Sequence, residues 1–243
     1  MRKPLLRVTQ LEKFRRFVSD EYEYETEQGV IDTITGDFKG NAYTCIGTAF
    51  HRIVEGNTAN VVKAEAGERK FLYYGREASE PVPCGRTFDI DGNKVTLDIP
   101  QCRTAVTYRE EHPDAYHEIR EWADFGNVVV TGCADMIDGM EIRDIKTKFS
   151  APSDRDYINS CQWRYYLELF GADTFHFDLF VFEGYSPDRH GTDIRGIPVR
   201  RHTPPITCYM YNGMEDDNRY LVKQFTEWAK YRNLIDKLPE YEL

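Results

Sequence analysis

The feature of this sequence that most constrains its fold is a pair of strand-like segments joined at Asp138-Gly139. Residues 128–137 and 140–148 look like consecutive β-strands, in which successive side chains point to opposite faces of the sheet. An Asp-Gly dipeptide between two such runs is a strong signal for a tight hairpin turn. The sequence therefore predicts two consecutive antiparallel strands in the middle of the chain.

The predicted register places three chemically important side chains together. With Asp138-Gly139 as a two-residue loop, Ile137 pairs with Met140. Because side chains alternate between the faces of a sheet, Asp135, Asp144 and Lys146 then project from the same face. The two carboxylates form a diagonal pair whose backbones lie roughly 7–8 Å apart.

Two carboxylates and an amine among apolar neighbours are costly to bury unless something compensates their charge. A divalent cation such as Mg²⁺ or Mn²⁺ would do so, because these ions prefer oxygen ligands. Lys146, two residues beyond Asp144, is then placed to orient or deprotonate an attacking water. A plain Asp–Lys ion pair on a solvated sheet face explains the same residues and stays open on this pattern alone.

The rest of the pattern mixes helices and strands. Helices are expected at 10–19, 44–55, 99–111, 153–171 and 218–238, with a loop at 20–42. Strands are expected at 116–125 and 174–185, in a hairpin over 87–98 and in a strand pair within 197–211. No linker or repeat divides the sequence, so we expect one domain over residues 1–243, with an α/β or mixed α+β fold.

Composition limits the classes of protein. A hydrophobic content of 41% with 30% charged residues is typical of a folded globular chain. There is no apolar run of about 20 residues and no secretory signal pattern, which predicts a cytoplasmic protein without a membrane segment. The net charge of −10 is unusual for a protein that binds nucleic acid. Bound divalent ions and a local clustering of basic residues would offset that charge.

The cysteines give no sign of a metal cluster. The six residues are scattered, with no close pair of the kind that zinc and iron–sulfur sites use. We therefore expect small core thiols and no cysteine-bound cofactor.

Three short patterns surround the hairpin in the sequence. His51 follows Gly47 by four residues on an expected helix, Gly132 precedes Asp135 by three, and Gln162 and Tyr166 share one helical face. Each pattern alone has an ordinary structural explanation. In this order, together with Asp144-Ile145-Lys146, they resemble the RecB-like branch of the PD-(D/E)XK nuclease superfamily over roughly residues 9–183.

That resemblance implies specific roles. The fold would be a central mixed β-sheet flanked by helices, with a restriction-endonuclease-like core. One or two Mg²⁺ or Mn²⁺ ions would be held by His51, Asp135, Asp144 and the backbone carbonyl of Ile145. Lys146 would activate water, and Gln162 and Tyr166 would hold the lysine or a DNA phosphate in place; Glu55 and Glu118 are candidate supporting groups.

The resemblance also suggests a biological setting. Some members of the branch carry a four-cysteine iron–sulfur cluster, with three of the cysteines near the C-terminus. Only Cys208 lies beyond Cys161, so the chain looks like the cluster-free kind. Its size resembles that of phage exonucleases, which implies an exonuclease of phage-type recombination or DNA repair. Such a protein would act on DNA, as a homo-oligomer or with a single-strand annealing protein.

Two other hypotheses remain at this point. One is a nucleic-acid-binding or assembly protein that has the nuclease fold and does not cut. The other is an acidic domain that binds a protein partner and holds no metal, which the net charge of −10 favours slightly.

Overall fold

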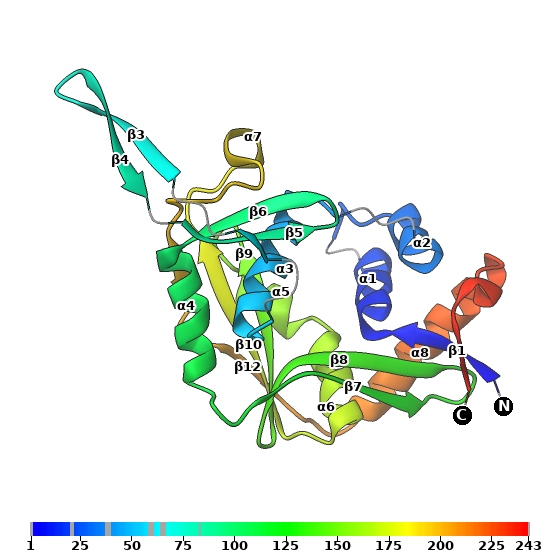
Figure 1. Ribbon diagram of the computed structural model, residues 1–243. Helices are drawn as coiled ribbons and strands as arrows, with labels where there is room; N and C mark the ends of the chain where they lie inside the picture. The colour runs from blue at the N-terminus through cyan, green and yellow to red at the C-terminus, as the bar shows by residue number, and fades with distance from the viewer. Residues whose placement is uncertain are drawn as a thin grey trace.

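A mixed sheet forms the centre of the computed structural model, which describes residues 2–19, 22–36, 40–57, 61–63, 67–82 and 84–242 (Figure 1). In these residues, eight strands form one sheet in the order β11-β10-β9-β8-β1-β13, with β7 paired to β8 and β12 to β10. Both parallel and antiparallel pairs occur, and helices flank the sheet. The predicted mixed α/β architecture is confirmed.

The strands of the large sheet come from both ends and from the middle of the chain. They are β1 (Arg2–Arg7), β7 (Tyr116–Asp124), β8 (Val129–Asp138), β9 (Glu141–Lys148), β10 (Thr174–Phe182), β11 (Val199–Arg201), β12 (Ile206–Tyr209) and β13 (Glu240–Glu242). A smaller sheet contains β2 (Val61–Lys63), β5 (Cys84–Ile90) and β6 (Asn93–Asp98). The hairpin of β3 (Gly67–Tyr73) and β4 (Arg76–Val82) projects away from the body of the molecule (Figure 1).

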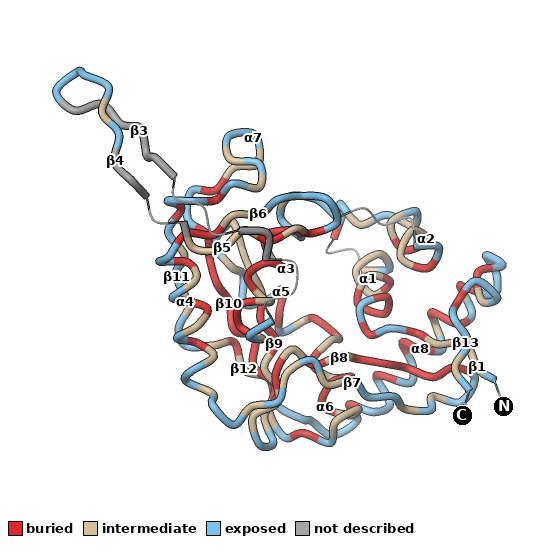
Figure 2. The backbone as a smooth tube through the Cα atoms, in the orientation of Figure 1, coloured by how far each residue is buried: buried red, intermediate tan, exposed pale blue. Residues whose placement is uncertain are grey.

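The helices pack with the sheet to form two hydrophobic cores. Their bounds are α1 (Val8–Val18), α2 (Glu27–Thr35), α3 (Ala42–Val54), α4 (Ile99–Glu110), α5 (Asp154–Ile158), α6 (Gln162–Phe170), α7 (Pro187–His190) and α8 (Met214–Tyr231). One core joins α1, α2, α6 and α8, whereas the other joins α3, α4 and the β5–β6 hairpin. Strand β10 serves both, because Phe175 and Phe177 face the first core and Phe180 and Phe182 the second. Figure 2 shows the buried residues concentrated along β8 and β10.

Most predicted elements are present, with corrections at their ends. The expected loop at 20–42 contains α2, which Thr26 caps by accepting a hydrogen bond from the Gly29 amide. Residues 20–21 and 37–39 of that loop lie outside the described residues. The strands expected to pair within 197–211 instead lie one after the other along β10.

The helix expected at 153–171 is two helices. Between α5 and α6, the Ser160 hydroxyl accepts the Gln162 amide, while the Ile158 carbonyl accepts the Trp163 indole N–H. These local bonds compete with the helical pattern and interrupt it. The last long helix also differs, because α8 begins at Met214 and ends at Tyr231.

The hairpin turn lies one residue later than predicted. Asp138 pairs with Glu141, so that Gly139 and Met140 form the loop, with Gly139 at a φ of 62°. This register pairs Ile137 with Ile142 and leaves Met140 55% exposed. Apolar pairing across the strands therefore outweighs the Asp-Gly turn preference.

In the observed register Asp135, Asp144 and Lys146 still share one face, but Asp135 and Asp144 are placed differently relative to each other. Continuing the pairing of Ile137 with Ile142 places Asp135 directly opposite Asp144. The diagonal arrangement predicted from the sequence is therefore wrong. Opposed positions lie closer together than diagonal ones, although the backbone pairing of β8 with β9 ends at Met136 and Arg143.

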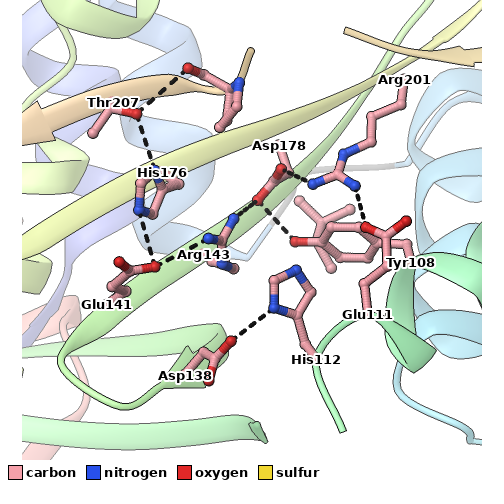
Figure 3. Close-up of polar contacts among 12 residues, drawn as sticks. Tyr108, Glu111, His112, Asp138, Glu141, Arg143, His176, Asp178, Arg201 and Thr207 are labelled. Atoms are coloured by element: carbon pink, nitrogen blue, oxygen red, sulfur yellow. Dashed lines mark hydrogen bonds and ion pairs between the residues drawn. The ribbon is translucent and has the colours of Figure 1, made fainter. Parts of the chain in front are cut away.

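A buried ionic network lies on the face of β10 that contacts α4 (Figure 3). The Asp178 carboxylate is fully buried and accepts hydrogen bonds from the Tyr108 hydroxyl at 2.8 Å, Arg143 at 3.0 Å and Arg201 at 2.9 Å. The paired charges offset the cost of burial, and the bonds tie β9, β10 and β11 to α4. In the described part of the chain, no helix is long and apolar enough to cross a membrane.

Candidate active site

The candidate site is a fork in the sheet beside β8. Strand β7 pairs with one edge of β8 from Val129 to Ile137. Strands β1 and β9 must therefore share the opposite edge, where β1 pairs with residues 129–131 and β9 with residues 136–138. Residues 132–135 lie between these two pairings. The two strands leave a gap there, and a cavity of about 410 Å³ lies beside it, lined by Asp135, Asp144, Lys146, Gln162 and Tyr166 among others.

Side chains replace the backbone ladder at this fork. The Ile145 amide donates a 2.7 Å hydrogen bond to Asp135 Oδ2, and the Tyr166 hydroxyl donates a 2.9 Å bond to the Cys133 carbonyl. A buried backbone group needs such a partner when strands diverge. The bonds therefore hold the fork open and fix the Asp135 carboxylate above β9.

Asp144 and Lys146 form a close ion pair in the cavity. Lys146 Nζ lies 2.9 Å from Asp144 Oδ1, to which it donates a hydrogen bond, and 2.8 Å from Oδ2. Asp144 is only 6% exposed, and its buried Oδ2 makes no hydrogen bond of acceptable geometry. A buried carboxylate oxygen in this condition has spare capacity for another electropositive partner.

Burial and the neighbouring charges both shift the pKa values of Asp144 and Lys146. The pKa of Asp144 is raised to about 6 in total, because burial and the negative charge of Asp135 raise it by more than Lys146 lowers it. Burial alone would lower the pKa of Lys146, but the charges of Asp144 and Asp135 outweigh it and raise that pKa above its usual value. The lysine is therefore protonated at neutral pH in this arrangement.

His51 approaches the same carboxylates from α3. Its Nδ1 lies 3.7 Å from Asp135 Oδ2. Gly47, one turn earlier, explains how the helix comes so close, because a Cβ there would lie 2.9 Å from Thr147 Oγ1 on β9. The glycine in the Gly-x-x-x-His pattern thus permits the contact between the helix and the sheet.

Gln162 and Tyr166 enter the cavity from α6. Tyr166 reaches the Cys133 carbonyl across Gly132, where a Cβ would lie 3.1 Å from the tyrosine ring and would press against it. Gln162 is the first residue of α6 and lines the cavity beside Lys146. The structure brings together all the site side chains named from the sequence, and their chemical roles stay predictions.

The start of α6 is fixed by a buried carboxylate on α1. Glu12 is 5% exposed, accepts the Cys161 amide at 2.8 Å and binds both Arg15 and Arg16. Burial raises the pKa of Glu12, but the hydrogen bonds and charges of the two arginines prevail and lower it to about 2. Glu12 lies within the helix expected at 10–19, and the local sequence gives no sign of this contact.

Other charged groups around the cavity were not predicted. Arg7 on β1 and Arg120 on β7 line it, so basic side chains border the carboxylates.

Glu118 lies across from Asp135 in the β7–β8 pairing, at a φ of 54°. Burial raises the pKa of Glu118 and the charge of Asp135 adds to the shift; Glu55 has a raised pKa through burial and the nearby Glu118. Both supporting groups named from the sequence therefore lie near the site.

The arrangement is not a ready-made metal centre. Among the residues that the structure describes, no three His, Cys, Asp or Glu side chains are grouped so as to hold a metal ion. The Asp135 carboxylate accepts a backbone amide and Asp144 binds Lys146. An ion would therefore need small rotations of these side chains.

Comparisons with known proteins concern the fold alone. No family model and no curated protein sequence matches the chain. A crystal structure described as "Putative exonuclease" from Eubacterium rectale superposes with a TM-score of 0.51 and 10% identity, over 98% of this chain and 84% of that one. A crystal structure of a protein designated SSO0001 has 18% identity and a TM-score of 0.34 over 50% of this chain, which spans about half (54%) of that protein.

Proposed function

We propose that this protein is a divalent-metal-dependent nuclease of the PD-(D/E)XK type that hydrolyses phosphodiester bonds in DNA. The observation that carries the proposal is the convergence of Asp135, Asp144 and Lys146 at one fork in the sheet, beside His51 from another element. The four residues come from positions between 51 and 146, and only folding brings them together. The likeness in fold to a protein described as an exonuclease supports the same reading.

The donor groups fit Mg²⁺ or Mn²⁺. Two carboxylates, an imidazole and the carbonyl of Ile145 are hard or borderline ligands suited to these ions. The buried Oδ2 of Asp144 lies 2.8 Å from the Lys146 ammonium without a well-aligned hydrogen bond, so it can also accept a metal cation. His51, Asp135, Asp144 and the Ile145 carbonyl would hold one or two ions. The bound metal would supply Lewis-acid stabilisation of the phosphate and a lower pKa for the attacking water.

The remaining residues act on water and on the phosphate. Lys146 retains its proton while it lies beside the carboxylates, so it orients water and neutralises charge that develops on phosphate oxygens. Gln162 lines the cavity next to it. Tyr166 fixes the edge of β8 through its bond to the Cys133 carbonyl, which keeps Asp135 in position.

Exonuclease action on DNA in phage-type recombination or repair is the specific activity that we favour. The likeness in fold to a protein described as an exonuclease favours release of nucleotides from a DNA end. Partners of the same setting would be a second copy of this chain or a single-strand annealing protein. We place the activity in the cytoplasm, where such substrates occur.

The direct test is degradation of end-labelled linear DNA with Mn²⁺, Mg²⁺ or EDTA. We expect metal-dependent release of nucleotides by the wild type and a loss of about 100-fold or more for Lys146→Ala, with Mn²⁺ binding by calorimetry largely retained. Lys223→Ala, on the exposed face of α8, is the matched control and should cut normally. Near-normal cutting by Lys146→Ala would refute the role given to that lysine.

A protein that binds DNA without cutting is the second candidate, and the Asp144–Lys146 ion pair favours it. That pair is already formed at 2.8 Å in a site without a preformed metal cluster. His51→Ala separates the two functions, because it should weaken Mn²⁺ binding if the site holds a metal. Wild-type protein that binds DNA but stays inert with every divalent ion would favour the second candidate.

A further inference from the structure

A second cavity adjoins the candidate site at the far end of β9. It has a volume of about 420 Å³ and is lined by side chains of α3 and β9 and by residues just beyond that strand. Lys148 lines it and, two residues after Lys146, lies on the same face of β9. Gly47 lines it from α3, one turn before His51. The cavity is therefore next to the place where a scissile phosphate would lie.

Aromatic rings form one wall of this cavity. The rings of Tyr43 and Phe149 lie 4.9 Å apart between centroids, and Tyr185 packs behind both at 5.5 and 4.7 Å. Tyr43 is 40% exposed although it belongs to this cluster. The cluster therefore offers an anchored but accessible aromatic surface, of the kind on which unpaired bases stack.

Positive charge and polar groups surround the rings. Tyr43 and Thr44 belong to the first turn of α3, a 13-residue helix whose N-terminus carries a partial positive charge. Lys148 is half-buried with its ammonium group 5.7 Å from the Tyr157 ring, and burial lowers its pKa. Ser150 lies on the exposed rim. Aromatic surface with flanking positive charge is the combination that binds single-stranded nucleic acid.

We infer that this cavity is a subsite for one unpaired nucleobase of the bound DNA strand, stacked on Tyr43 and Phe149 next to the cleaved phosphate. The inference rests on the proposed function for the identity of the ligand. The start of α3 contacts the phosphate that follows this base, and Lys148 lines the same cavity with its ammonium group over Tyr157. The subsite holds the strand by stacking, so it tolerates any base and selects for an end or segment that is unpaired.

Fluorescence of 2-aminopurine tests the inference in binding, separately from cleavage. All variants carry Lys146→Ala, so that DNA stays intact, and the probe is a single-stranded oligonucleotide with 2-aminopurine at each position in turn. At one position, binding should quench the fluorescence. Tyr43→Ala should abolish that quenching and raise the Kd roughly tenfold. Tyr43→Phe keeps the ring and should behave as the parent, as should Tyr231→Ala, a tyrosine on α8 that is 80% exposed.

A blocking variant guards against loss of folding in Tyr43→Ala. Ser150→Leu places a larger, non-aromatic side chain at the exposed rim of the cavity, and it should also remove the quenching while thermal unfolding stays unchanged. Full quenching and unchanged affinity in either folded variant would overturn the subsite. In the cleaving background, Tyr43→Ala should raise KM for single-stranded ends more than it lowers kcat.

The two proposals fail in different ways. If the parent stacks 2-aminopurine through Tyr43 but wild type never hydrolyses DNA, the nuclease proposal is wrong and the subsite stands. If wild type hydrolyses DNA and Tyr43→Ala stacks the probe normally, the subsite is wrong and the nuclease proposal stands.

Discussion

Replacing Glu12 by glutamine tests how the helix that carries Gln162 and Tyr166 is held. The Glu12 carboxylate binds Arg15 and Arg16 on its own helix and accepts the Cys161 amide at the start of α6. Glutamine keeps the size and one acceptor but removes the negative charge. The two arginines then lose their buried counter-charge.

The pKa of Glu12 gives the size of the effect. A fall from the usual 4.5 to about 2 corresponds to about 3 kcal/mol of stabilisation at 1.36 kcal/mol per pH unit. Because the pKa is lower in the folded protein, this stabilisation is fully present above the unfolded value of 4.5 and is lost as the pH falls towards 2. We expect Glu12→Gln to reduce the free energy of unfolding by about 3 kcal/mol at neutral pH and by little near pH 2.

Urea denaturation followed by tryptophan fluorescence, repeated from about pH 7 to about pH 2, measures this difference. Glu227→Gln is the matched control, because Glu227 is largely exposed in a pair with Lys223 and should cost less than about 0.5 kcal/mol. If the difference between wild type and Glu12→Gln were the same at every pH, the buried ionic contact would not be its cause. An equal stability at neutral pH would also refute the reasoning.

Three further substitutions test other parts of the site and its support. Tyr166→Phe should cost about 1–3 kcal/mol in urea denaturation, because the Cys133 carbonyl loses its hydrogen bond; no loss would mean that water replaces the hydroxyl. Asp178→Asn should lower the stability by about 3–5 kcal/mol, because it leaves two arginine side chains without their buried counter-charge; a thermal midpoint equal to wild type would contradict this. Gly47→Ala should cost about 1–3 kcal/mol by overpacking, and adding Thr147→Ala should recover most of it; a loss that persists in the double variant would place the strain elsewhere.

The local sequence pattern was sufficient for the hairpin and for the face on which its charged residues lie. Asp135, Asp144 and Lys146 share a face in the predicted register and in the observed one. Ile137 pairs with Ile142 and not with Met140, and a shift of two residues along a strand leaves every side chain on the same face. The turn itself was misplaced by one residue. A dipeptide preference is weaker than the pairing of Ile137 with Ile142 across the strands.

Contacts between distant parts of the chain could not be predicted in the same way. Nothing local indicates that Glu12 accepts the amide of Cys161, or that β1 pairs beside β9 along the same edge of β8. Strand β1 lacks a clear alternating pattern in its sequence. It forms a strand because it pairs with β8 and β13. Tertiary pairing outweighs weak local propensity at such positions.

The sequence by itself determined that a hairpin forms in the middle of the chain and which charged side chains share one of its faces, because these properties follow from backbone periodicity over a few residues. Only the tertiary structure decided that β1 and β9 leave a gap beside β8 and that α3 and α6 reach into it. The contacts of β1, α3 and α6 with β8 join residues more than 30 positions apart, and they depend on how whole elements bury their apolar faces against one another.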